Sequence, residues 1–98
     1  MSSAHSTVSL DDERVRVTTW SFAADGDNTG WHVHEYDYVI VPVTGGSFAV
    51  TGPGGETREL AQQAGAPYLG HAGTEHDVVN ASGGRAVFVE IELKGAGE

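Results

Sequence analysis

The sequence predicts an all-β fold, either a sandwich or a barrel. No segment of the 98 residues sustains the 3.6-residue apolar period of a helix over a useful length. Instead, about eight short apolar runs are separated by turn residues, among them 14 glycines and three prolines. Many short strands joined by tight turns are typical of closed or two-layered β architectures. A chain of this length is expected to form one domain, which we place at residues 11–98.

The N-terminal third is expected to contain a tail, one strand and a loop. Residues 1–10 are small and polar, which predicts a flexible tail. Alternation in residues 14–22, with Val15 and Val17 on one face, predicts the first strand. Clustered Gly, Asp and Asn residues in positions 23–30 indicate the loop that follows.

The middle of the chain is expected to form strands separated by Gly-containing turns. Residues 31–43 are rich in β-branched and aromatic side chains and form either a strand pair or one long bent strand. Pro42 cannot donate a hydrogen bond to a sheet, so it marks an edge, a bulge or a strand end. Residues 47–51 and 56–60 are the next two strands, because the Pro-Gly pair between them favours a type II turn.

The C-terminal third is expected to add two longer strands. Residues 64–73 are Gly-rich with a short apolar centre, and residues 76–80 predict a strand. The last strand covers residues 85–93 and alternates strictly, with aliphatic side chains on one face. Its other face carries one phenylalanine and two glutamates, so it lines either a cavity or the solvent.

Composition excludes several classes of function. The net charge of −9, with only five Lys and Arg residues, argues against nucleic-acid binding. The chain has no Cys, so disulfides, thiolate ligands and Cys nucleophiles are excluded. No apolar run reaches the roughly 18 residues of a membrane span, and the first residues do not resemble a signal peptide. We therefore expect a cytoplasmic protein whose partners are a small molecule and, as a homodimer, a second copy of itself.

His32-Val33-His34 is the most informative motif of the sequence. Residues two apart on a strand point to the same side, so the two imidazoles project together. Imidazole is the commonest neutral metal ligand near neutral pH, and a third candidate, His76, follows downstream. The motif indicates either a metal site or a pair of hydrogen-bonded histidines without a metal.

Two blocks of the sequence resemble the two motifs of the cupin superfamily. The first motif is Gly, five residues, His-x-His, three or four residues, Glu, six residues, Gly; the second is Gly, five residues, Pro-x-Gly, two residues, His, three residues, Asn. The matching positions of this chain are His32, His34, Gly45, Gly65, Gly73, His76 and Asn80. The resemblance covers residues 14–94 and implies a double-stranded β-helix, the cupin jelly-roll β-barrel. Residues 30–38 are similar to small single-domain cupins, some of them assigned to β-alanine breakdown.

Three positions depart from these motifs. The opening Gly of the first motif is absent, because Gly30 lies only two residues before His32. The Glu position is Tyr38 or, with the longer spacing, Val39, so the usual carboxylate ligand is missing. The Pro position of the second motif is occupied by His71.

The resemblance implies that His32, His34 and His76 bind one divalent transition metal. Iron, zinc, nickel, manganese and copper all accept imidazole, so the ligand type does not select among them. Three neutral imidazoles leave the ion its full charge, and open positions would let water, oxygen or a substrate bind.

Four further residues are candidates for acid–base work near the metal. Tyr38 points to the same side as the His pair and could reach a bound ligand. His71 is either a fourth ligand or proton shuttle, or a turn residue that faces the solvent. Glu90 and Glu92 are either bases or hydrogen-bond acceptors for a His N–H, or part of a solvated face.

The leading hypothesis from the sequence is a metal-dependent enzyme that acts on a small polar metabolite inside the barrel. The reaction is an oxygenation (dioxygenase), or else an isomerase or lyase step through a metal-polarised carbonyl. One alternative is a non-catalytic cupin that binds or senses a small molecule. Another is a metal-free dehydratase or epimerase that uses His and Tyr alone.

Overall fold

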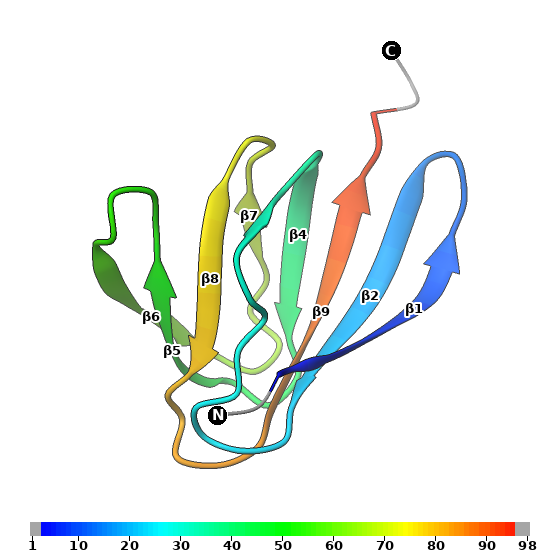
Figure 1. Ribbon diagram of the computed structural model, residues 1–98. Coiled ribbons are helices and arrows are strands. Elements are labelled where there is room, and N and C mark those ends of the chain that lie inside the picture. Colours follow the sequence, from blue (N-terminus) through cyan, green and yellow to red (C-terminus); the bar gives the residue numbers. More distant parts are fainter. Residues whose placement is uncertain (1–2, 96–98) are drawn as a thin grey trace.

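The computed structural model describes residues 3–95 and consists of two antiparallel β-sheets that enclose the core between them (Figure 1). Within the described residues the chain forms these strands: β1 (His5–Asp11), β2 (Val15–Phe22), β3 (His32–Val33), β4 (Asp37–Pro42), β5 (Gly46–Thr51), β6 (Thr57–Gln62), β7 (Tyr68–Gly70), β8 (Glu75–Asn80) and β9 (Ala86–Leu93). One sheet has the order β1-β2-β9-β4-β7 and the other β3-β8-β5-β6. This is a double-stranded β-helix. No helix within the described part of the chain is long and apolar enough to cross a membrane.

The segment at residues 31–43 forms two strands that belong to different sheets. β3 pairs with β8, whereas β4 pairs with β9 and β7. Between them the backbone of His34 leaves the ladder: its N–H donates to the Thr74 carbonyl, and its carbonyl accepts from the Gly73 N–H, both at 2.8 Å. These bonds to a distant loop explain why the strand pair allowed by the sequence is split between the two sheets.

The chain passes from one sheet to the other between β4 and β5. Pro42 is the last residue of β4, as its missing N–H predicts. Gly45 follows with a φ of 74°, and a Cβ there would lie 3.0 Å from the carbonyl oxygen of Gln62. The crossover therefore requires glycine, both for its backbone conformation and for the close approach of β6.

The prediction of a flexible tail over residues 1–10 is wrong for residues 5–10, which belong to β1. This strand pairs with β2, with a register shift between Val8 and Leu10. All seven residues of β1 are exposed, so no buried apolar face marks the strand in the sequence. Its order comes from backbone hydrogen bonding to β2 rather than from burial. Residues 1–2 lie outside the described residues.

Three phenylalanines join the two sheets. Phe22 in β2 and Phe88 in β9 belong to one sheet, and Phe48 in β5 belongs to the other. The centroids of the three rings are 5.2 to 5.6 Å apart, and Phe22 and Phe48 are fully buried. Edge-to-face and tilted contacts at this distance add to the free energy gained by burying the rings.

Asn80, the last residue of the second cupin motif, has a structural role. It is only 1% exposed, and its side-chain amide donates to the carbonyls of Ala24 and Gly84, at 3.1 and 2.6 Å. Its side-chain oxygen accepts the Ser82 N–H at 3.0 Å. Through these hydrogen bonds, Asn80 connects the loop before β3 to the turn between β8 and β9.

Candidate metal centre

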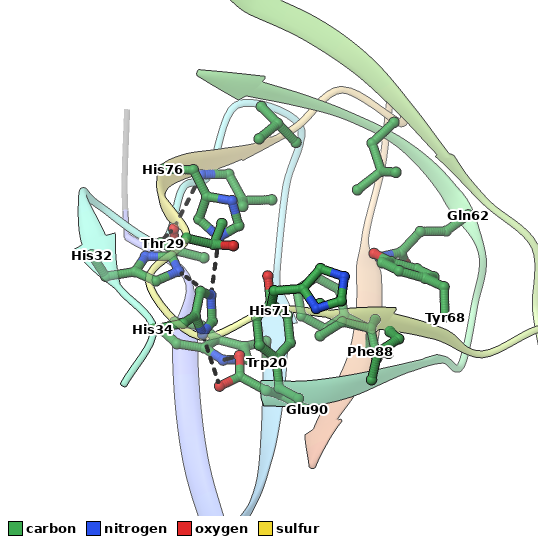
Figure 2. Close-up of a pocket in the computed structure, with 18 of the residues that line it drawn as sticks. Trp20, Thr29, His32, His34, Gln62, Tyr68, His71, His76, Phe88 and Glu90 are labelled. Carbon is green, nitrogen blue, oxygen red and sulfur yellow. Dashed lines mark hydrogen bonds and ion pairs between the residues drawn. The ribbon is translucent and has the colours of Figure 1, made fainter. Parts of the chain in front are cut away.

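Three imidazole rings converge at one place between the two sheets (Figure 2). His32 of β3 lies directly across from His76 of β8, and His34 follows one residue after β3. The Nε2 atom of His34 is 3.2 Å from that of His32 and 3.1 Å from that of His76. The ligand atoms of all three lie within 4.8 Å of one another.

These separations suit one metal ion. Metal–imidazole bonds are about 2.0–2.1 Å long, which separates neighbouring ligand nitrogens by about 3.0 Å in octahedral and about 3.4 Å in tetrahedral geometry. The two shortest distances in the group, 3.1 and 3.2 Å, fall in this range. The residues present therefore fit a divalent transition metal with three nitrogen ligands.

The hydrogen-bonding of the rings favours the tautomer that a metal needs. His32 Nδ1 is 2.9 Å from the Gly30 carbonyl oxygen, which can only accept, so the ring proton lies on Nδ1. His32 Nε2 then presents a lone pair to the cluster. His34 Nδ1 faces Glu90 Oε2 at 3.9 Å, longer than a hydrogen bond, and the ionised form of this carboxylate favours the same tautomer there.

The pKa values of two of the rings keep them neutral. Burial, followed by the nearby His32 and His76 rings, lowers the pKa of His34 to about 4. Burial also lowers the pKa of His76 to about 4, with His32 the next largest cause. Neutral imidazole is the form that binds metal, so both rings have the ligand form at neutral pH.

The histidines open into a cavity of about 360 Å³ between the sheets. This volume lies in the range of small-molecule sites. Apolar side chains line much of its wall, namely Ile40, Val50, Leu60, Leu69, Val78 and Phe88. Polar side chains are spaced among them, namely Trp20, Thr29, Arg58, Gln62, Tyr68, His71, Thr74 and Glu90.

Tyr38 lies against the metal ligands. Its ring stacks on that of His34, with centroids 3.8 Å apart and planes inclined by 18°. The cross-strand partner of Tyr38 is Gly70, and a Cβ at that position would overlap the Tyr38 ring. Burial raises the pKa of Tyr38, with Glu90 the next cause, so its hydroxyl stays protonated at neutral pH. Tyr38 takes the motif position of a carboxylate ligand and positions His34 through its ring.

Glu90 lines the cavity. Of the two alternatives predicted for this face of the last strand, a cavity or the solvent, the cavity is therefore the one found at Glu90. The indole N–H of Trp20 donates to its Oε1 at 3.2 Å. Burial, followed by the nearby Glu92, raises the pKa of Glu90 to about 7. Glu90 thus has both the placement and the proton affinity of a group that could exchange a proton with a ligand.

Glu92 and His71 differ from Glu90 in their surroundings. The Glu92 carboxylate is bound by Arg16, at 2.6 Å from Nε and 3.1 Å from Nη2, and does not line the cavity. This position favours a structural ion pair rather than the predicted catalytic role. His71 lines the cavity from an exposed turn, where its ring makes no hydrogen bond to residues 3–95 (Figure 2).

The sequence did not reveal Arg58, Gln62 and Tyr68 as part of this site. Arg58 and Gln62 share one face of β6, and Leu60 lies between them on that face. The recurrence of Arg58, Leu60 and Gln62 at every second residue was the available signal. The strand is polar on both faces, however, so its pattern does not tell which face is turned inward.

Comparison with known proteins identifies close relatives. No protein-family model matches the chain. The Beta-alanine degradation protein BauB of Pseudomonas aeruginosa is 47% identical over 88 residues, which cover 90% of each chain. The crystal structure of a cupin domain from Bordetella pertussis is 44% identical, with a TM-score of 0.88 over 94% of each chain. A double-stranded β-helix protein from Klebsiella pneumoniae has the same fold at 21% identity, with a TM-score of 0.76 over 95% of this chain and 78% of that one.

Proposed function

We propose that this chain, which belongs to the cupin superfamily, is a metal-dependent enzyme that acts on a small polar metabolite in the cavity between its sheets. The observation that carries the proposal is the convergence of the Nε2 atoms of His32, His34 and His76 at the wall of that cavity. The relative from Pseudomonas aeruginosa is named for β-alanine degradation. We therefore place the substrate among the small amino and carboxylic acids.

The residues around the cluster have separate roles in this proposal. His32, His34 and His76 would hold a divalent ion, which would supply Lewis acidity or, if redox-active, oxygen chemistry. Tyr38 and Glu90 orient His34 from two sides. Glu90 is the candidate to exchange a proton with the substrate, and His71 the candidate to relay it at the exposed side of the cavity.

The metal content of variants purified without a His tag tests the proposal. Wild-type protein is expected to hold about one ion per chain, and His34→Ala to lose it by roughly tenfold or more. His71→Ala is the matched control, because its ring lies outside the cluster, and it should keep the metal. Equal metal in wild type and His34→Ala, with the variant folded by circular dichroism, contradicts the proposal.

The identity of the ion then separates the two reaction classes. Iron or copper favours oxygenation, which oxygen consumption in the presence of small amino and carboxylic acids would detect. Zinc favours the isomerase or lyase route through a polarised carbonyl.

The distances in the cluster favour a second candidate, a metal-free binding protein. Separations of 3.1 and 3.2 Å between ring nitrogens are also hydrogen-bond distances. A proton on His34 Nε2 can serve only one of its two neighbours, however, whereas one cation satisfies all three lone pairs. This difference is why we rank the metal-bound form first.

A further inference from the structure

Arg58 is an exposed cation whose side chain lines the cavity. Within residues 3–95 it makes no hydrogen bond or ion pair, so no acidic residue of this part of the chain neutralises the guanidinium. Its charge lowers the pKa of His76 and opposes the rise in the pKa of Tyr38, so it acts on the inside of the cavity.

The strand register places Arg58 close to the metal ligands. Arg58 lies across from Val50, which lies across from Val78 on its other side, and His76 is two residues from Val78 along β8. Strands about 4.8 Å apart and a rise of about 3.3 Å per residue separate the Cα atoms of Arg58 and His76 by about 12 Å. An extended arginine covers about half of that distance, so a small molecule can bridge the two sites.

Gln62 supplies a second unpaired group on the same face of β6. Its side-chain N–H donates to the Tyr68 hydroxyl at 2.8 Å, while its Oε1 is buried without a hydrogen-bond partner. Gln62 is only 8% exposed, and a buried polar atom without a partner is rare in a folded protein. Whichever way the amide is turned, the Gln62–Tyr68 pair keeps one donor and one acceptor for a ligand.

The two groups indicate the chemical class of the ligand. The planar guanidinium of Arg58 matches a carboxylate in a two-point hydrogen-bonded pair. A phosphate is a poorer match, because the lining contains one arginine and no lysine. Gln62 lies four residues from Arg58, about 13 Å along the strand, with the apolar Leu60 between them. The wall thus suits a short chain with a carboxylate at one end and a polar group at the other.

We propose that the cavity face of β6 recognises the substrate, with Arg58 binding its carboxylate and the Gln62–Tyr68 pair binding an amino or hydroxyl group at its other end. The ligand class is the short ω-amino and ω-hydroxy acids. This proposal deepens the proposed function and rests on it for the chemistry that follows binding, although binding itself depends on β6.

Binding of a graded series of probes tests this assignment. The series is glycine, β-alanine, 4-aminobutyrate, 5-aminovalerate and 6-aminohexanoate, with butyrate and butylamine as probes that lack one end. Titration calorimetry should show that at least one amino acid of the series binds more tightly than both butyrate and butylamine. Arg58→Met should weaken that binding by roughly tenfold or more, as expected for a charge-assisted hydrogen bond. Arg85→Met, which removes an exposed arginine outside the cavity, should leave it unchanged.

The Gln62 end is tested separately. Gln62→Leu should weaken binding of the ω-amino acid several-fold and leave binding of butyrate unchanged. The assignment is overturned if no member of the series binds, if inorganic phosphate binds more tightly than any of them, or if both arginine variants behave alike. All titrations are repeated after treatment with a chelator. Binding that depends on Arg58 but persists without metal supports recognition of the ligand by β6, even if the metal-content test contradicts the proposed metal-dependent function.

Discussion

Gly70 shapes the metal centre by lacking a side chain. Tyr38 lies across from it on β4, and the Tyr38 ring occupies the space that a Cβ of residue 70 would need. The same ring stacks on His34. The position of the His34 ring, a candidate metal ligand, therefore depends on a glycine outside the histidine cluster.

The first prediction concerns Gly70→Ala. The added methyl group must displace the Tyr38 ring, which should lower the free energy of unfolding by about 1–3 kcal/mol, as overpacking does. Displacement of the ring should also weaken metal binding, because His34 loses its stacking partner. Urea unfolding and metal titration measure the two effects.

Gly84→Ala is the control for this prediction. A Cβ at Gly84 would meet nothing within 4 Å. Its stability should therefore stay within about 0.5 kcal/mol of wild type. If Gly70→Ala is no less stable than Gly84→Ala, the close packing of Tyr38 on β7 does not determine the geometry of the centre.

At the scale of residues, the sequence predicts the three candidate metal-binding histidines better than it predicts Arg58 and Gln62 in the cavity wall. The two-residue period of His32 and His34, and the match of His76 to the second motif, bring together the rings that converge in the structure. Arg58 and Gln62 share a face of their strand, but no motif marks that face as the one that lines the cavity. Polar residues occupy both faces of their strand, and only pairing with β5 decides which face turns inward.

The connection between β1 and β2 depends on Asp12. Its Oδ1 accepts the backbone N–H groups of Val15 and Arg14, at 2.9 and 2.8 Å, and these bonds lower the pKa of the carboxyl. The ionised side chain therefore stabilises the turn that starts β2.

The second prediction follows from the sign of this pKa shift. A carboxyl whose pKa is lowered by folding adds stability above its unfolded pKa of about 3.8 and loses it as the pH falls through the folded value. Asp12→Ala should therefore lower the melting temperature at pH 7, and the difference from wild type should shrink below pH 4. Glu13→Ala, the neighbouring exposed acid, should show no such difference. A difference for Asp12→Ala that is constant with pH would show that the charge has no part in the turn.

At the scale of elements, β5, β6, β8 and β9 follow the predicted strands closely, since turn residues separate them. β7 is a strand within a segment that the sequence marks only as Gly-rich with a short apolar centre. Two other segments also differ from their predictions. β1 has no buried side, so nothing in its composition distinguishes it from a tail. Residues 31–43 divide at His34 because the backbone there bonds to the loop before β8. Contacts between distant segments decide both cases, and a local pattern does not contain them.

For the molecule as a whole, a bound metal would tie together two segments that are distant in the sequence, β3 with the residues after it and β8. β3 is only two residues long and is paired only with β8 among the named strands. An ion shared by His32, His34 and His76 would attach this short edge strand and the loop after it more firmly to β8.

The third prediction is that removing the metal lowers the stability of the protein and increases local unfolding around β3. A site saturated about 1,000-fold above its Kd adds about 4 kcal/mol, which in a domain of this size corresponds to a fall in melting temperature of more than about 10 °C on chelation. Hydrogen exchange should increase at residues 30–36 and stay unchanged in β2 and β9. If chelation lowers the melting temperature but hydrogen exchange increases evenly over all strands, the metal does not stabilise β3 in particular. An unchanged melting temperature and unchanged exchange would also contradict the prediction.

The predicted homodimer and the barrel differ in how far they follow from the sequence. Turn spacing predicts a sandwich or a barrel, and the resemblance of the two motifs to those of cupins implies the double-stranded β-helix that the structure has. The surface that would join two copies stays a prediction. Exposed Val8 and Leu10 on the edge strand β1 are consistent with it.

The three phenylalanines of the core affect how this protein can diverge over evolutionary time. Phe22 and Phe48 do not line the cavity, whereas Phe88 does. Replacing a wall residue such as Leu60 therefore leaves the contact between Phe22 and Phe48 intact. Related proteins can therefore acquire new specificities by substitution of cavity residues without loss of the core. Phe88 is the exception, because it belongs to both the cavity wall and the phenylalanine core.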